Sequence, residues 1–123
     1  MPPPTINLSA KLAAFDRLWS PKVIAELNGQ MVKLVKVEGE YVWHHHADED
    51  ELFLVLTGEL EIHFRDGVAT LSEGELIVVP RGVEHKPVAR RPAEILLFEP
   101  ATTRNTGNVD HAWTVVPESL ERI

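Results

Sequence analysis

Short apolar runs separated by turn residues follow Ser20-Pro21, and this pattern predicts an all-β fold. The alternation is clearest over Glu59–Arg65, where every second residue is apolar and the others are charged or His. Successive side chains of a strand point to opposite faces, so such a segment has one face in the core. The pattern predicts strands over Val23–Leu27, Met31–Val37, Tyr41–His46, Glu51–Thr57, Glu59–Arg65, Val68–Leu71, Leu76–Val79, Glu84–Val88 and Glu94–Glu99.

Two-residue turns join some of these strands. Asn28-Gly29 and Asp66-Gly67 are the dipeptides that favour tight hairpins, since both central positions of such a turn need a positive φ. Arg90-Arg91-Pro92 separates the last two predicted strands. Many short strands with regular turn signals are typical of an antiparallel sandwich or barrel.

The two ends of the chain have other patterns. Residues 1–20 predict a loose arm followed by a short helix that Asn7 or Ser9 caps. Leu8, Leu12 and Phe15 recur at helical spacing and give this segment one apolar face. Residues 100–123 are polar and irregular, with Val109–Val116 as a candidate extended segment at a barrel edge.

Composition narrows the class of protein. A length of 123 residues fits one domain spanning 1–123, and 44% hydrophobic with 25% charged residues is ordinary for a globular chain. The net charge of −7 argues against nucleic-acid and anionic-membrane binding, because both need a surplus of Lys and Arg. No segment has the pattern of a leader peptide or a membrane span, so a cytoplasmic location is expected.

The segment from Trp43 to Glu51 carries the first candidate for chemistry. Residues i and i+2 share a face of a strand, so His44 and His46 point the same way and His45 points oppositely. A turn over residues 47–50 then brings Glu51 beside them, although Glu49 or Asp50 could supply the carboxylate instead. Two imidazoles about 7 Å apart along a strand can tilt onto one ion.

A second candidate lies further along the chain. An apolar strand from Gly74 ends at Pro80-Arg81-Gly82, and His85 follows three residues after the glycine. If this strand lies beside the first segment, His85 completes a ligand set. The chain has no Cys, so imidazole and carboxylate alone would bind the ion. Such ligands suit one divalent Fe, Mn, Ni, Zn or Cu ion.

The two segments resemble the paired motifs of the cupin superfamily. The first family pattern, Gly-x5-His-x-His-x(3,4)-Glu-x6-Gly, matches Gly39, His44, His46, Glu51 and Gly58, with four residues instead of five after Gly39. The second, Gly-x5-Pro-x-Gly-x2-His-x3-Asn, matches a run whose key positions are Gly74, Pro80, Gly82 and His85, with Ala89 in place of Asn. Together the motifs cover about residues 39–89.

The resemblance implies a fold, a site and a partner. The implied fold is the cupin double-stranded β-helix, a jelly-roll-like antiparallel barrel, and a homodimer is frequent in the family. The implied metal ligands are His44, His46, Glu51 and His85. The chain also looks like the small stand-alone cupins labelled mannose-6-phosphate-isomerase-like, a label that describes kinship and not an activity.

Strand parity predicts an apolar pocket around the ion. Phe53 and Val55 share the parity of Glu51 and should face the barrel interior. The other expected lining residues are Val42, Leu60, Ile62, Phe64 and Val83. An apolar lining around one polar centre is the usual form of a small-molecule site.

The remaining His and Trp residues have simpler expected roles. His45 is expected on the surface or as a neighbour that supports the ligands, His63 is expected in contact with solvent, and no partner is evident for His111. Trp43 points opposite to His44 and should brace the outside of the barrel or a dimer contact.

Three functions agree with this pattern. The leading hypothesis is a metal-dependent enzyme, oxygenase-like or isomerase-like, that acts on a small oxygen-bearing metabolite. No Lys, Tyr or His is clearly placed on the inner face as a general base, which weakens the isomerase hypothesis. The alternatives are a non-catalytic protein that binds or senses a metal or small ligand, and a purely structural barrel.

Overall fold

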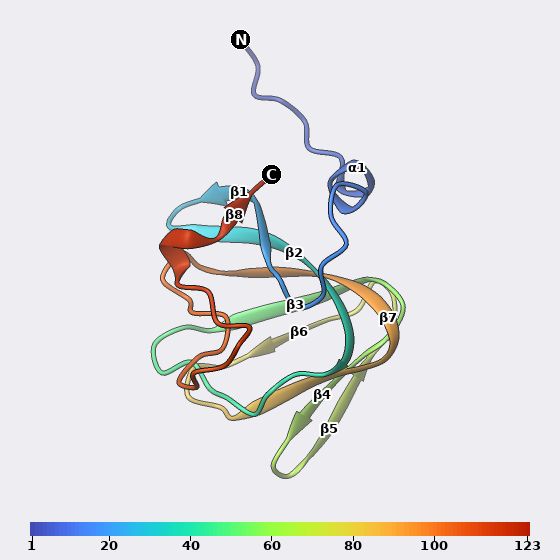
Figure 1. The fold of residues 1–123 in the computed structure, drawn as a ribbon, viewed down its shortest axis with the longest axis vertical. Coiled ribbons are helices and arrows are strands. Elements are labelled where there is room, and N and C mark those ends of the chain that lie inside the picture. The colour runs from blue at the N-terminus through green and yellow to red at the C-terminus, as the bar shows by residue number, and fades with distance from the viewer.

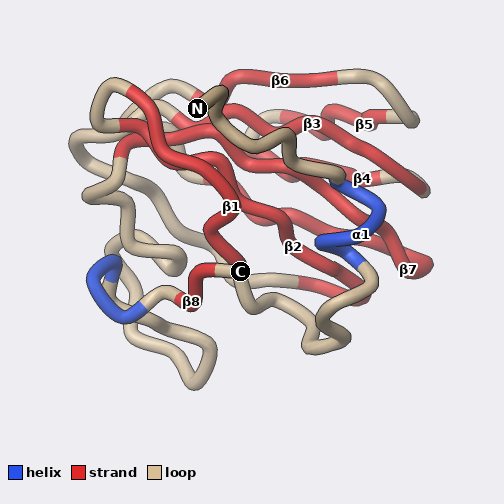
Figure 2. Tube along the Cα trace, turned by 90° about the horizontal axis from the view of Figure 1, so that it is seen from above, coloured by secondary structure: helices blue, strands red, loops and turns tan.

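The structure is a computed structural model that describes residues 1–123 and is built mainly of strands (Figures 1 and 2). Its elements are α1 (Leu8–Leu12), β1 (Lys22–Leu27), β2 (Gln30–Glu40), β3 (Glu51–Thr57), β4 (Leu60–Phe64), β5 (Gly67–Leu71), β6 (Leu76–Val79), β7 (His85–Pro100), the 3-10 helix η1 (Pro117–Ser119) and β8 (Glu121–Arg122). The predicted all-β, jelly-roll-like fold with a short N-terminal helix is confirmed.

The 16-residue strand β7 organises the sheet. Its first part pairs with β4, its second part pairs with β3, and β2 runs antiparallel along most of its length. The strand order is β5-β4-β7-β2-β1-β8, and β3 joins β7 to β6. Because β7 pairs with β2 along one edge and with β4 and then β3 along the other, the sheet curves around a shared interior (Figure 1).

The predicted break at Arg90-Arg91-Pro92 is wrong, because β7 continues through it. Val37 pairs with Ala93 and Gly39 pairs with Ala89, so residues 90–92 form a bulge in β7 opposite the single residue Glu38 of β2. Proline has no N–H to donate to a sheet, but a bulge does not require that hydrogen bond. The strand therefore passes through Pro92 without losing a regular pair.

Two other predicted strands are also absent. Tyr41–His46 forms only an isolated bridge between His44 and His85, since regular pairing ends with β2 at Glu40. Val109–Val116 contains a turn, and Thr114 N donates to His111 O. The edge pairing expected there is made instead by β8, which runs parallel to β1.

The predicted helix is confirmed at its start and is shorter than its apolar pattern. Asn7 caps it, since its side chain accepts a hydrogen bond from Ala10 N at 2.9 Å. The helix ends at Leu12, but Phe15 still packs with Leu12 against Leu34 of β2. The helix thus covers part of the outer face of the sheet.

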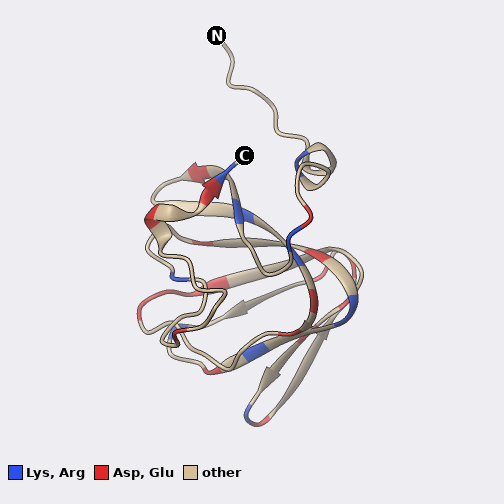
Figure 3. Ribbon diagram, in the orientation of Figure 1, with Lys and Arg blue, Asp and Glu red and all other residues tan.

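The main core fills the barrel between the two layers. It consists of buried apolar residues from most strands, joined by Trp19 from the segment before β1: Val35, Val37, Phe53, Val55, Leu60, Ile62, Leu71, Val79, Ala89, Ala93, Ile95 and Leu97. Acidic and basic residues are interspersed along the chain and do not gather in one region (Figure 3). No helix of this structure has the length and apolar character needed to cross a membrane.

Candidate metal centre

Four side chains converge at one end of the barrel. His44 and His46 come from the segment between β2 and β3, Glu51 is the first residue of β3, and His85 is the first residue of β7. One ligand atom from each of these residues lies within 4.8 Å of the others, and all four residues are buried. The reciprocal backbone hydrogen bonds between His44 and His85, at 3.1 and 2.9 Å, align the two segments.

The other acids of the turn point elsewhere. Asp50 is exposed and pairs with Arg81, whose backbone N donates to it at 2.8 Å. Glu49 accepts a hydrogen bond from the Thr102 hydroxyl at 2.9 Å. Glu51 is therefore the acid of this run that reaches the three histidines.

Backbone carbonyls orient two of the imidazole rings. His44 Nδ1 lies 2.9 Å from Val42 O, and His85 Nδ1 lies 2.9 Å from Val83 O. A carbonyl only accepts, so each Nδ1 carries the proton and each Nε2 keeps its lone pair. His85 Nε2 is 3.3 Å from Glu51 Oε1, in the middle of the cluster.

The surroundings of His46 show whether these residues fit a metal ion. Its side chain is buried, yet neither ring nitrogen makes a hydrogen bond. His46 Nε2 lies 3.3 Å from Glu51 Oε1, on the same side as His85. A buried polar atom without a partner is costly, and coordination of a cation would satisfy it. The donor set and its geometry fit a divalent transition metal.

Burial and mutual contacts shift the pKa values of the cluster. Burial, helped by the nearby His85, lowers the pKa of His44 to about 4. Burial alone would raise the pKa of Glu51, but the close imidazoles of His46 and His85 outweigh it and hold that pKa well below its usual range. At neutral pH the cluster therefore has a neutral His44 and an ionised Glu51, the forms that bind a metal ion.

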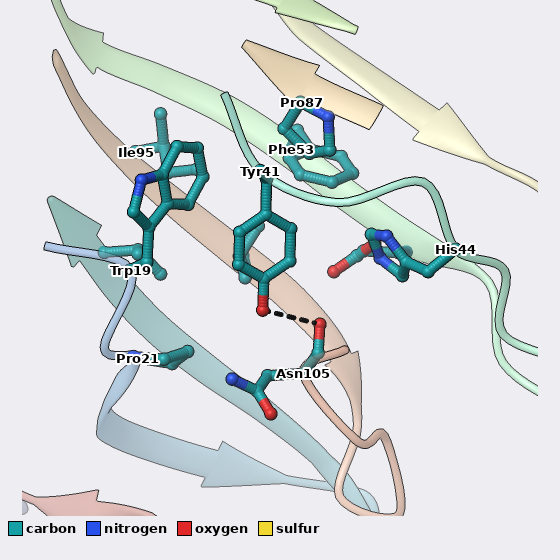
Figure 4. A pocket seen from close by; sticks show the side chains of 11 residues that line it. Trp19, Pro21, Tyr41, His44, Phe53, Pro87, Ile95 and Asn105 are labelled. Carbon is teal, nitrogen blue, oxygen red and sulfur yellow. Dashed lines mark hydrogen bonds between the residues drawn. The ribbon is translucent and has the colours of Figure 1, made fainter. Parts of the chain in front are cut away.

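A small apolar cavity adjoins His44 and Glu51 on the interior side (Figure 4). Its volume is about 30 Å³, enough for one or two water-sized molecules. Tyr41 lies between Trp19 and His44, with ring centroids at 4.7 and 5.5 Å, and its hydroxyl donates to Asn105 O at 3.2 Å. The full lining is Trp19, Pro21, Val35, Tyr41, His44, Glu51, Phe53, Pro87, Ile95, Leu97 and Asn105.

Strand parity located only part of this lining. Phe53 faces the cavity, whereas Val55, Leu60 and Ile62 are buried deeper in the core. Phe64 packs half-buried against that core, and Val42 is half-buried outside the lining.

Val83 is a correction to the expected lining, because its side chain is exposed. It lies in the turn before β7 begins at His85, where strand alternation does not apply.

Several lining residues had no signal in the sequence. Tyr41 belongs to a segment that is not a strand, so parity could not orient it. Trp19 has a positive φ of 55° just before β1, and Asn105 comes from the irregular tail. These positions depend on long-range packing.

The C-terminal tail covers the centre from outside. Asn108 N donates to His45 O at 3.1 Å, and His45 N donates to Asn108 Oδ1 at 2.9 Å. Gly107 fits between them, since a Cβ there would lie 2.2 Å from His45 O and 3.0 Å from His44 Cδ2. Trp113 stacks on Tyr41 with a centroid distance of 5.4 Å. The tail thus forms one wall of the site.

The other aromatic and imidazole groups lie outside the cluster. Arg65 and Lys86 flank the Trp43 ring, with the Arg65 guanidinium 3.8 Å from its centroid, so Trp43 does brace the outer surface. His63 is half-buried and paired with Glu61 at 2.8 Å. His111 does have a partner, because its Nδ1 accepts a hydrogen bond from Trp113 N.

A buried ion pair near Glu51 was missed by the sequence reasoning. Lys33 Nζ lies 2.9 Å from Glu99 Oε1, and neither side chain is more than 1% exposed. Burial and the neighbouring Glu51 raise the pKa of Glu99 well above its usual range, against the opposing effect of Lys33. Strand parity was the available signal, because Lys33 lies on the same face of its strand as the inward-facing Met31 and Val35.

Comparison with known proteins places this architecture in a family. Residues 31–99, more than half of the chain, match the model of the Cupin domain family. The chain belongs to the cupin family. The matched span contains all four clustered side chains of this cupin.

Two solved structures resemble this cupin over most of its length. A cupin-2 domain containing protein from Shewanella frigidimarina is 55% identical and has a TM-score of 0.76, with 77% of this chain and 93% of that chain covered. Protein NMB1881 from Neisseria meningitidis is 37% identical with a TM-score of 0.73, and the match covers 79% of this chain and 99% of that one.

A curated relative matches a shorter region. The uncharacterized protein YdbB of Bacillus subtilis is 47% identical over 64 residues, which is 51% of this chain. The match spans 57% of the length of YdbB.

The pKa values of the cluster predict an acid-sensitive fold when a chelator keeps metal away. The unfolded chain protonates His44 near pH 6.5, whereas the folded chain does so only near pH 4. Stability should therefore fall as the pH falls through this window, by up to about 1.4 kcal/mol per pH unit. Below the window, protonation of Glu51 acts in the same direction. Urea unfolding at several pH values measures the slope.

The His44→Gln variant should flatten that slope between pH 6.5 and 4. His45→Gln is the matched control, since the ring of His45 lies outside the cluster. An unchanged slope in His44→Gln would contradict the assignment.

Proposed function

We propose that this cupin binds one divalent transition metal ion through His44, His46, Glu51 and His85. The observation that carries the proposal is that four buried donor atoms lie within 4.8 Å of one another, with both ring nitrogens of His46 unpartnered. The carbonyls of Val42 and Val83 would keep the Nε2 atoms of His44 and His85 directed at the ion. The proposal extends to a small oxygen-bearing molecule as the ligand of the adjoining cavity.

The ion would act as a Lewis acid that polarises a bound oxygen or lowers the pKa of bound water. The chain's own residues set the conditions for this chemistry. The apolar wall of Phe53, Ile95 and Leu97 excludes bulk water and strengthens electrostatic interactions at the centre. Trp19 and Tyr41 limit the size of the ligand that reaches His44.

We propose a metal-dependent enzyme as the leading function, with oxygenase-like chemistry favoured over isomerase-like chemistry. An isomerase needs a group that moves a proton between substrate carbons, and Tyr41 is the only hydroxyl-bearing residue of the lining. Burial raises the pKa of Tyr41 above its usual range, and its proton is donated to Asn105 O. Tyr41 is therefore a poor base, and activation of the substrate would depend on the metal.

A non-catalytic binding or sensing protein is the second candidate. The observation that favours it is the small cavity, whose lining contains no side chain suited to proton transfer apart from the proposed metal ligands. A centre of this kind could retain a small ligand without converting it. The cytoplasmic location also stays a prediction.

Metal content gives the direct test of the centre. Wild-type protein should carry about one divalent metal ion per chain by elemental analysis, and His85→Ala should lose most of it, because the three remaining ligands bind the ion more weakly than four. His63→Ala is the matched control, since this histidine pairs with Glu61 away from the cluster. Equal metal content in wild type and His85→Ala would refute the proposed ligand set.

Turnover separates the two candidate functions. The metal-loaded protein should consume dioxygen together with a small diol or keto acid from a broad panel, and Phe53→Ala should change which substrate is preferred. Oxygen uptake and product analysis give the measurement. Tight retention of a panel member without any conversion would favour the binding protein.

We also propose that the protein forms a homodimer through the outer face of β2, β7, β3 and β6. Cross-strand partners share a face. They form two apolar rows on this face: Val32, Phe98, Leu52 and Val78, then Leu34, Leu96, Leu54 and Leu76. Helix α1 packs over Leu34 and Leu96, but Leu76 and Val78 remain 57% and 51% exposed. Apolar rows free of charge suit a second copy of an acidic chain, because no acids would face each other.

Substitution on this face should dissociate the dimer. Light scattering after size-exclusion chromatography should give twice the chain mass for wild type and a monomer for Val78→Glu, because a buried carboxylate without a partner is costly. Val68→Glu on β5 is the matched control, since Val68 is 54% exposed away from the rows. A monomeric wild type would reject the dimer.

A further inference from the structure

The segment that carries His44 and His46 is held from two opposite edges. On one edge, the backbone N and O of His44 hydrogen-bond to the backbone of His85 at 3.1 and 2.9 Å. Around such an antiparallel bridge, the backbone groups of successive residues point to opposite edges, so those of His45 face away from His85. His45 has no strand partner on that side, and Asn108 of the C-terminal tail pairs with it instead.

The pair of His45 and Asn108 holds both peptide planes of His45. His45 N donates to Asn108 Oδ1 at 2.9 Å, and Asn108 N donates to His45 O at 3.1 Å. A peptide unit is planar from one Cα to the next. The first bond therefore fixes the plane that begins at the Cα of His44, and the second fixes the plane that ends at the Cα of His46. The directions in which both imidazoles leave the backbone thus depend on this one tail residue.

The loop that presents Asn108 is itself held in shape. Arg104 Nη1 donates to Gly107 O, and Gly107 N donates to Arg104 O, both at 2.9 Å. Gly107 lies so close to the ligand segment that a Cβ at this position would overlap His45 O. Its φ of 56° is also one that glycine adopts readily. The loop can therefore approach His45 closely enough for Asn108 to form both hydrogen bonds.

We propose that Asn108 is a positioning residue of the candidate metal centre, which acts by holding the backbone between His44 and His46. This role rests on the proposed metal-binding function. Asn108 is not one of the four clustered ligands, so it acts on the ion only through the orientation of the imidazoles. Rings that already point at a common centre lose less conformational freedom when the ion binds, so the pair should raise the metal affinity. By thermodynamic reciprocity, a bound ion should in turn stabilise the pair.

Removal of the side-chain hydrogen bond should weaken Co²⁺ binding. Asn108→Ala deletes the acceptor for His45 N but keeps the backbone bond, and the Co²⁺ dissociation constant should rise by about tenfold. The visible absorption spectrum of bound Co²⁺ should also change, because the two imidazoles would shift around the ion. Asn108→Asp keeps an oxygen at the same place and should restore both the affinity and the spectrum, in high salt that screens the added charge.

Two controls separate this role from a general loss of stability. Asn7→Ala removes the same kind of bond at helix α1, where Asn7 Oδ1 accepts from Ala10 N at 2.9 Å. Thr102→Val removes a hydrogen bond from the tail to Glu49, which is not one of the four clustered ligands. Both variants should bind Co²⁺ as tightly as wild type and give the wild-type spectrum.

Competition with a chromophoric chelator measures the Co²⁺ dissociation constants of the full chain. Weaker binding with an altered spectrum in Asn108→Ala, and recovery of both in Asn108→Asp, support the inference. Wild-type affinity and spectrum in Asn108→Ala, even with a lower Tm, overturn it, because the bond would then serve stability alone. An equal loss of affinity in Asn7→Ala or Thr102→Val also overturns it.

Amide hydrogen exchange of the wild type gives a test that needs no variant to fold. Zn²⁺, a d¹⁰ ion without unpaired electrons, should slow the exchange of the His45 and Asn108 N–H groups more than that of Ala10. An equal effect at the three amides, or no effect, overturns the inference. The proposed function fails, and this role with it, if wild type binds neither ion or His85→Ala binds Co²⁺ equally well. If His85→Ala loses Co²⁺ while Asn108→Ala keeps wild-type binding, only the positioning role is refuted.

Discussion

The burial of ionisable side chains in an apolar barrel is the constraint on which this structure depends. His44, His46, Glu51 and His85 are removed from water, as are Lys33 and Glu99 nearby. Most of their polar atoms are satisfied by one another or by backbone carbonyls, which requires close registration of β2, β3 and β7. The hydrophobic core stabilises the barrel, while the buried polar groups demand one specific arrangement of it.

The long strand β7 links these requirements. It carries His85 at one end and Glu99 near the other, and it pairs with three other strands. The bulge at residues 90–92 lets this one strand pair with β4, β3 and β2 without a break. The candidate centre and the ion pair behind it are thus positioned by the same backbone.

Local patterns in the sequence predicted the regular strands, the helix cap at Asn7 and the grouping of the four candidate ligands. They failed where tertiary structure overrides local signals. Pro92 indicated a break because the local sequence does not show that a bulge places it where no ladder hydrogen bond is needed, and Val83 follows no strand parity because it lies in a turn. Lys33 was overlooked because charged residues are assumed to face solvent, although its spacing of two residues from Met31 places both side chains on the inner face.

The cover formed by the C-terminal tail has a consequence for biosynthesis. Asn105, Gly107 and Trp113 wall the centre, but they leave the ribosome after all four candidate ligands have been made. The centre is therefore enclosed only after the tail has folded back onto the barrel. An ion that binds before this step would meet a site that is open on one side.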